Sequence, residues 1–161
     1  MNSQRCCWSL VAVAAVLGLP ATARAESAPS LEVPPYYVGL GVRGGKGDST
    51  AVVIDSKIKL MDVGERTFST RPALLLGGYD TEWRLPFTIE GKKNARGWSL
   101  FGGVGLAYNM DDLGKTDAML VAGVDRAVSR QLILNLTFNY IYQSDISDDD
   151  SEFLATLNYR F

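Results

Sequence analysis

The side chains that usually carry out catalysis are scarce in this sequence. It contains no histidine, so a His-based nucleophilic mechanism is impossible. Serines such as Ser99 and Ser144 have no evident base to activate them. The segment from Gly39 to Gly44 matches the pattern G-x-G-x-x-G, but a dinucleotide site needs these glycines to open a helix after a strand, and here they lie within a strand-like segment. We therefore expect no enzyme, no catalytic residues and no cofactor.

Carboxylates are concentrated in the acidic segment from Asp145 to Glu152. Carboxylate oxygens can bind Ca²⁺ or Mg²⁺, but the spacing here lacks the glycine that an EF-hand loop requires at its sixth position. Two interpretations stay open: a solvated acidic loop, and a loop whose carboxylates bridge weakly to phosphates through divalent cations. Neither predicts a defined metal site.

The two cysteines, Cys6 and Cys7, lie in an N-terminal segment that resembles a secretory signal. Arg5 precedes an apolar run from Trp8 to Leu19, which is too short to span a bilayer as a helix, and small residues precede a cleavage site after Ala25. We predict a cleaved signal peptide at residues 1–25, followed by an irregular, proline-containing lead at residues 26–35. Cleavage would leave no cysteine, and hence no disulfide and no Cys-based metal site.

The overall charge argues against nucleic acid as a partner. The chain carries 16 Lys and Arg against 18 Asp and Glu, a formal net charge of −2, and cleavage would also remove Arg5 and Arg24. A nucleic-acid-binding domain needs a basic surface, which this composition does not supply.

The rest of the chain alternates apolar and polar residues with the period of two that is typical of β-strands. Turn-forming residues separate eight such segments. They are Tyr36–Arg43, Thr50–Leu60, Thr67–Gly77, Thr81–Glu90, Gly97–Asn109, Thr116–Asp125, Gln131–Gln143 and Glu152–Phe161. No long segment after the predicted signal has helical periodicity.

An even number of antiparallel strands can close into a barrel with no free edge, and eight strands leave an interior that side chains can fill. From Trp98 to Tyr108 the chain takes ten residue steps, about 33 Å at ~3.3 Å per residue. A tilt of about 40° projects this length to about 25 Å, the height of the apolar band of a membrane barrel. We therefore predict that residues 36–161 form an all-β, eight-stranded, antiparallel up-and-down transmembrane β-barrel.

The aromatic residues distinguish a membrane barrel from a soluble one. Large rings occur near both ends of the predicted strands, with aliphatic residues between them, which is the girdle pattern of membrane barrels. The predicted girdle residues are Trp83, Trp98, Tyr108, Tyr140 and Tyr142. The apolar faces should then contact lipid, and the opposite faces should line the lumen.

Charged residues fall on these opposite faces in equal numbers of each sign. The predicted lumen charges are Arg43, Lys57, Lys59, Arg71, Arg84 and Arg160 against Asp55, Glu82, Glu90, Asp117, Asp125 and Glu152. Pairing offsets the cost of burying such charges, so we expect a salt-bridged plug. Inward-facing glycines at 39, 41, 103 and 105 should make room for the long side chains of arginine and lysine.

The last four strands resemble small outer-membrane barrels of the OmpA/OmpX type or the opacity type. The stretches that carry the resemblance are Trp98–Tyr108, Ala122–Leu132, Leu136–Tyr140 and Leu157–Phe161. The resemblance implies an outer-membrane location, with outer-membrane lipid and lipopolysaccharide as partners. It also implies that the barrel assembly machinery reads the terminal strand, through the signal residues Phe153, Leu157, Tyr159 and Phe161.

The function that fits these expectations is a monomeric, non-enzymatic outer-membrane barrel with a structural or surface role and a filled lumen. Two other classes remain open. One is a narrow, porin-like passive channel for ions or small solutes. The other is a soluble periplasmic lipid-binding barrel, which would keep the strands but turn the apolar faces inward.

Overall fold

The computed structural model describes residues 33–45, 50–77, 81–91, 97–110, 115–142 and 150–161. The predicted signal peptide, most of the predicted N-terminal lead and most of the acidic segment 145–152 lie outside the described residues. Within the described ranges, no helix has the length and apolar character needed to cross a bilayer.

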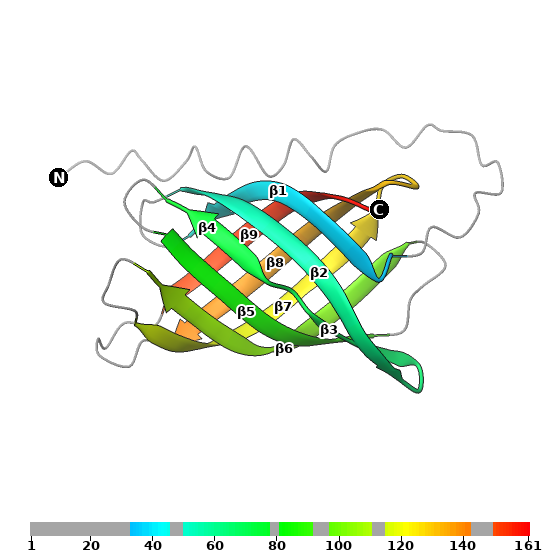
Figure 1. The fold of residues 1–161 in the computed structure, drawn as a ribbon, viewed down its shortest axis with the longest axis horizontal. Coiled ribbons are helices and arrows are strands. Elements are labelled where there is room, and N and C mark those ends of the chain that lie inside the picture. Colours follow the sequence, from blue (N-terminus) through cyan, green and yellow to red (C-terminus); the bar gives the residue numbers. More distant parts are fainter. Residues whose placement is uncertain (1–32, 46–49, 78–80, 92–96, 111–114, 143–149) are drawn as a thin grey trace, which may run out of the picture.

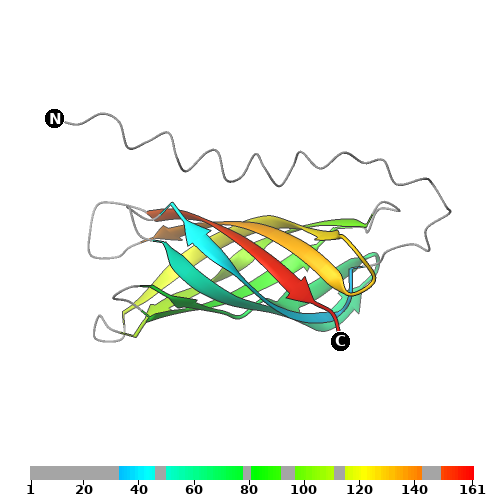
Figure 2. The ribbon, with the colours of Figure 1, turned by 90° about the horizontal axis from the view of Figure 1, so that it is seen from above.

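Alternating apolar and polar residues form nine strand segments. They are β1 (Tyr36–Gly44), β2 (Ala51–Val63), β3 (Arg66–Thr70), β4 (Ala73–Leu76), β5 (Thr81–Glu90), β6 (Trp98–Asn109), β7 (Thr116–Ala127), β8 (Leu132–Tyr142) and β9 (Asp150–Tyr159). Every pairing is antiparallel, and β1 pairs with both β2 and β9, so the sheet closes on itself (Figures 1 and 2). The predicted eight-stranded barrel is confirmed.

The nine segments occupy eight positions because β3 and β4 both lie between β2 and β5. The predicted single strand Thr67–Gly77 is therefore interrupted, at Arg71 and Pro72. Proline has no N–H to donate to a neighbouring strand. Ser56 bridges the interruption, since its backbone N–H and its hydroxyl both donate to the Pro72 carbonyl, at 3.1 and 2.9 Å.

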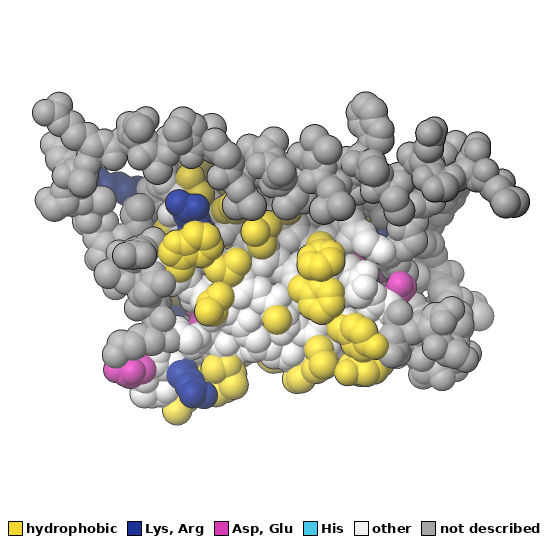
Figure 3. Space-filling view, turned by 180° about the vertical axis from the view of Figure 1, so that it is seen from behind, with side chains coloured by type: hydrophobic (Ala, Val, Ile, Leu, Met, Phe, Trp, Pro, Cys, Tyr) yellow, Lys and Arg dark blue, Asp and Glu magenta, His cyan; other side chains and the backbone are white. Residues whose placement is uncertain are grey.

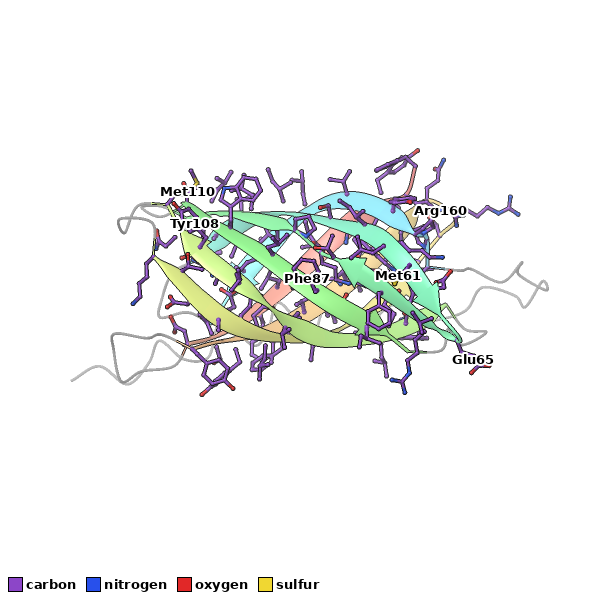
Figure 4. The ribbon with its side chains drawn as sticks, turned by 60° about the horizontal axis from the view of Figure 1, so that its bottom comes forward. Met61, Glu65, Phe87, Tyr108, Met110 and Arg160 are labelled. Carbon is purple, nitrogen blue, oxygen red and sulfur yellow. The ribbon has the colours of Figure 1, made fainter. Side chains whose placement is uncertain are left out.

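The two ends of the barrel differ in their connections. At one end, here called the terminal end, β1 begins, β9 ends, and the turns 64–65, 91–97 and 128–131 connect strands. At the other, here called the loop end, the connections are 45–50, 77–80, 110–115 and 143–149. Figure 4 shows Tyr108 and Met110 at the loop end and Met61, Glu65 and Arg160 at the terminal end.

The outer surface of the barrel is apolar. Leu100, Val104 and Phe153 are 69%, 60% and 63% exposed, and apolar side chains spread across the face shown in Figure 3. The alternate positions are buried and face the interior, where Asp125 and Glu152 are fully buried. The predicted orientation of the strand faces agrees with this arrangement, which is the reverse of a soluble barrel's.

Candidate functional site: the charged interior of the barrel

Two clusters of ion pairs lie in the interior, alongside buried apolar side chains such as Leu75 and Met119. The cluster nearer the terminal end, here called the Arg71 cluster, consists of Tyr37, Lys57, Arg71, Glu90 and Asp125. All five side chains are buried, and they come from β1, β2, β5, β7 and the break between β3 and β4. With two bases against two acids, the cluster is neutral in sum.

Arg71 is the centre of this cluster. Its Nη2 lies 2.7 Å from Asp125 Oδ2 and 3.0 Å from Glu90 Oε1, so one guanidinium joins two carboxylates. Its Nη1 donates to the hydroxyl of Tyr37, which in turn donates to Asp125 Oδ1 at 2.9 Å. Lys57 Nζ holds the other oxygen of Glu90 at 2.6 Å. Because each charged group has several hydrogen-bonding or ionic partners, the free-energy cost of burying it is largely offset.

An aromatic ring also packs against the guanidinium of Arg71. The Arg71 Cζ atom lies 3.6 Å from the centroid of the Phe101 ring, within the range of a cation–π contact. Phe101 is buried on β6, where the alternation of the strand turns its ring inward. Arg71 is thus held by charges on its edges and by a ring on its face.

The second cluster, here called the Arg84 cluster, lies nearer the loop end and consists of Arg43, Glu82, Arg84 and Glu152. Arg84 contacts Glu82 and lies 3.1 Å, Nε to Oε1, from Glu152. Arg43 Nη1 lies 3.1 Å from Glu82 Oε2 and 3.6 Å from Glu152 Oε2. The four groups therefore form a closed ring of alternating charge that links β1, β5 and β9 across the lumen.

Little open space remains between the two clusters. An internal cavity of about 20 Å³ is lined by Asp55, Arg71 and Arg84 among other residues. This is close to the space that one water molecule needs. The Asp55 carboxylate there accepts a hydrogen bond from Thr156 Oγ1 at 3.1 Å.

The start of the described chain covers the terminal mouth of the lumen. Val33 is 2% exposed and packs in one buried cluster with Tyr37 and Ile133. The Pro35 carbonyl accepts a hydrogen bond from the backbone N–H of Lys59 at 3.0 Å. At that end, Tyr37 thus packs against apolar side chains while its hydroxyl belongs to the Arg71 cluster.

The predicted girdle residues lie on the outer surface. Trp83 and Tyr108 pair directly across β5 and β6 near the loop end. Tyr140 and Tyr142, also near the loop end, have ring centroids 4.9 Å apart. Trp98 lies at the terminal end, where β6 begins, and pairs with Arg126 of β7. The predicted assembly-signal residues also face outward, with Phe153, Leu157, Tyr159 and Phe161 all exposed.

Three of the charges predicted for the lumen are placed differently. Arg160 is exposed, because β9 ends at Tyr159 and the alternation no longer applies beyond it. Lys59 is half-buried at the terminal rim, where it pairs with Asp62. Asp117 is only partly buried near the loop end, although its Oδ1 atom is enclosed. The other predicted lumen charges are buried in the interior.

The inward glycines have a role that alternation alone does not predict. A Cβ atom at Gly39 or Gly103 would lie 2.3 or 2.0 Å from a carbonyl oxygen of the neighbouring strand. A Cβ atom at Gly41 would lie 2.1 Å from the Ala155 carbonyl oxygen, and one at Gly105 would lie 2.5 Å from the Pro86 Cα atom. These glycines allow adjacent strands to approach closely.

Alternation places Asn135 and Asn139 on the lumen face of β8, whereas the cluster partners Tyr37 and Ser69 were not singled out from the sequence. Tyr37, Ser69, Asn135 and Asn139 all donate to cluster carboxylates: Tyr37 and Asn135 to Asp125, Ser69 to Glu90, and Asn139 to Glu152. Each lies on an inward position of its strand, so the same alternation that predicted the charges could also have found Tyr37 and Ser69. Among the described residues, no group of His, Cys, Asp and Glu side chains is arranged to hold a metal ion.

Comparison of the structure with solved proteins gives one consistent fold. The Yersinia pestis outer membrane protein Ail, in a phospholipid bilayer nanodisc, superposes with a TM-score of 0.56 at 11% sequence identity, over 78% of this chain and 98% of that chain. A crystal structure of Ail, the attachment invasion locus protein of Yersinia pestis, gives 0.50 at 13% identity, over 78% and 96%. This chain has the fold of the small outer-membrane β-barrels.

Comparisons of the sequence with known families and proteins find no match: no protein-family model matches it, and no curated protein is detectably similar to it. The two Ail structures share the barrel architecture, and at this level of identity the likeness concerns the fold alone.

Proposed function

We propose that this protein is a non-enzymatic structural or surface protein of the outer membrane, with a lumen closed by its own side chains. The observation that carries the proposal is the pair of ion-pair clusters, centred on Arg71 and Arg84, which together connect strands on all sides of the interior. The cavity of about 20 Å³ between the clusters has room for about one water molecule, which supports a lumen without a continuous water path.

The distribution of side chains supports a membrane-spanning barrel over a soluble one. The barrel turns apolar residues outward and buries charges, whereas a soluble lipid-binding barrel needs an apolar interior. In water, the exposed apolar outer surface of this barrel would cause the protein to aggregate. The soluble alternative is therefore set aside.

The predicted signal peptide at residues 1–25 supports export across the inner membrane, and the terminal aromatic residue Phe161 supports recognition by the barrel assembly machinery. In this orientation the terminal end faces the periplasm, because both chain ends of such barrels lie there. The partners are then outer-membrane lipid and lipopolysaccharide, and the barrel is a monomer.

The interior serines among the described residues support the non-enzymatic assignment. Ser69 donates to Glu90 at 2.8 Å, but Lys57 and Arg71 already hold that carboxylate. Ser99 is buried on an inward position, and its hydroxyl has no hydrogen-bond partner among the described residues. A catalytic serine needs a base within hydrogen-bond reach. The carboxylates of Glu90, Asp125 and Glu152 pair with cations, which accounts for their burial without a catalytic role.

Conductance in planar bilayers tests the closed lumen and separates it from a passive channel. The unmodified protein should show no steady conductance. The double variant Glu82→Ala, Arg84→Ala should leak, because it opens space while Arg43 and Glu152, 3.6 Å apart, can still pair with each other. Heat-modifiable gel mobility should show that both proteins are folded.

A matched control removes a different ion pair without opening the interior. The double variant Lys59→Ala, Asp62→Ala deletes one exposed pair at the terminal rim and should stay silent. Reproducible ion-selective openings of the unmodified protein would replace the closed lumen with the channel. A leak in the rim variant equal to that of the interior variant would also contradict the proposal.

A further inference from the structure

Three exposed arginines lie on adjacent elements at the terminal end of the barrel. Arg126 is near the end of β7, Arg130 is in the turn to β8, and Arg160 follows β9. The backbone N–H of Arg160 donates to the carbonyl of Gln131 at 2.9 Å, which holds the end of β9 beside that turn. None of the three guanidinium groups forms an ion pair within the part of the chain that the structure describes.

Arg126 lies on the lipid-facing side of its strand. Its Cζ atom is 4.8 Å from the centroid of the Trp98 ring, on the neighbouring strand β6. One step further into the apolar band, Val124 pairs with Leu100, which is 69% exposed. A charge on the lipid side is costly at the bilayer centre and tolerated at the interface, so Arg126 and Trp98 mark the edge of the hydrocarbon layer.

Acidic groups do not neutralise this surface. Asp62 and Glu65, which are exposed at the same end, belong to the β2–β3 hairpin. In the closed sheet order that hairpin lies opposite β7 and β8, and β1 separates it from β9. The nearby Asp125 carboxylate points into the lumen, where Arg71 and Asn135 bind it. On the face shown in Figure 3, Lys and Arg side chains lie toward one end of the barrel, and Asp or Glu side chains appear beside the lower of them at the same end.

We propose that Arg126, Arg130 and Arg160 form a binding site for the phosphate group of an anionic glycerophospholipid in the periplasmic leaflet. The inference rests on the proposed function, which places the terminal end in that leaflet. Guanidinium groups bind phosphate with two parallel hydrogen bonds, and basic residues at a membrane surface favour anionic lipids. The Trp98 ring holds the Arg126 guanidinium over the interface, where aromatic side chains are favoured.

Quenching of Trp98 fluorescence by brominated lipids measures this preference at the site itself. The protein carries Trp8→Phe and Trp83→Phe, so that Trp98 is the single reporter, and it is reconstituted into vesicles of phosphatidylcholine. Brominated phosphatidylglycerol or brominated phosphatidylcholine is then added at matched mole fractions. We expect the anionic lipid to bind about five-fold more strongly or better, the factor that one arginine supplies at a membrane surface.

The triple variant Arg126→Gln, Arg130→Gln, Arg160→Gln should quench equally with both lipids. The corresponding Arg→Lys triple variant should keep part of the preference, because it keeps the charge. As the matched control, Arg66→Gln removes an exposed arginine from β3, across the barrel, and should leave the preference unchanged. Added salt should weaken the preference of the unmodified surface.

Equal quenching of the unmodified surface by the two lipids would overturn the site and leave the closed membrane barrel intact. Loss of preference in Arg66→Gln equal to that in the triple variant would replace the site with a general effect of net charge. Failure of the protein to enter vesicles as a heat-modifiable barrel would instead overturn the proposed function, and this inference with it.

Discussion

The guanidinium of Arg71 lies over the ring of Phe101, with its Cζ atom 3.6 Å from the ring centroid. The Phe101 ring also lies against Gly123 of β7, where a Cβ atom would be 2.4 Å from Phe101 Cζ. The Arg71 cluster therefore depends on the absence of a side chain at Gly123. A small residue on one strand positions a ring on the next, and the ring positions the cation that joins two carboxylates.

The substitution Gly123→Ala tests this dependence. The new methyl group would overlap both the Phe101 ring and, at 2.5 Å, the Leu136 carbonyl oxygen, so β7 and β8 would have to separate. Overpacking of this kind costs about 1–3 kcal/mol. The free energy of unfolding in urea, measured on the barrel in detergent or lipid, should fall by that amount.

Gly102→Ala is the matched control, because Gly102 is on the outward side of β6 and a Cβ there would be 3.7 Å from its nearest neighbour. Both substitutions restrict the unfolded chain alike, so the difference between them is steric. Equal unfolding free energies for the two variants would contradict the packing role of Gly123.

The architecture could be predicted because alternation with a period of two determines both the strand and its buried face. For β8 the sequence indicates that Leu134 faces outward and Asn135 inward, and the structure has Asn135 buried. The interruption at Arg71 and Pro72 was harder to predict, since a proline inside a strand can sit at an edge, at a bulge or at a break. These cases are distinguished by the strand pairings on either side of Pro72, where β3 and β4 both pair with β2 and β5.

The pairing of the charges could not be predicted from alternation. A period of two shows which side of the sheet a residue faces. It does not give the register between strands, and so it does not show which charges lie at the same level of the lumen. Lys57 and Glu90 meet at 2.6 Å because β2 and β5 flank the short strand β3. Arg160 was placed in the lumen for the same reason, because parity does not show where a strand ends.

Removing the central cation of the Arg71 cluster should be severe. Arg71→Met keeps much of the side-chain volume but leaves Asp125 and Glu90 with fewer counter-charges in a buried setting. Breaking a buried ion pair by removing one partner costs about 3–5 kcal/mol. Urea titration of the folded barrel, followed by heat-modifiable mobility, should show this loss.

Lys59→Met provides the comparison for Arg71→Met. Lys59 pairs with Asp62 at the rim, where the two side chains are 31% and 52% exposed, and exposed pairs contribute about 0–1 kcal/mol. The further variant Arg71→Met, Asp125→Asn should lose less stability than Arg71→Met alone, because the second change removes a stranded charge. A loss for Arg71→Met no larger than for Lys59→Met would contradict the central role of Arg71.

The membrane position of the outer surface can be measured with single arginines. Val104 is 60% exposed near the middle of β6, so Val104→Arg should lower the unfolding free energy by about 2–4 kcal/mol in lipid. Leu132→Arg, at the start of β8 in the terminal end, should cost only about 0–1 kcal/mol. Equal costs in lipid would mean that the apolar band is not centred on the middle of the strands.

Deletion of Phe161 should affect assembly in cells more than folding itself. The ring is 79% exposed and follows the end of β9, so its removal takes away almost no packing inside the barrel. A defect would therefore come from the loss of a recognition element, and the amount of heat-modifiable protein in the outer-membrane fraction should fall several-fold. Refolding of the purified variant into detergent should proceed to the same yield as for the unmodified protein.

Arg160→Gln serves as the control, because it alters the adjacent exposed residue and leaves the aromatic terminus in place. Normal membrane levels after deletion of Phe161, or an equal loss in detergent refolding, would show that the ring is not read during assembly.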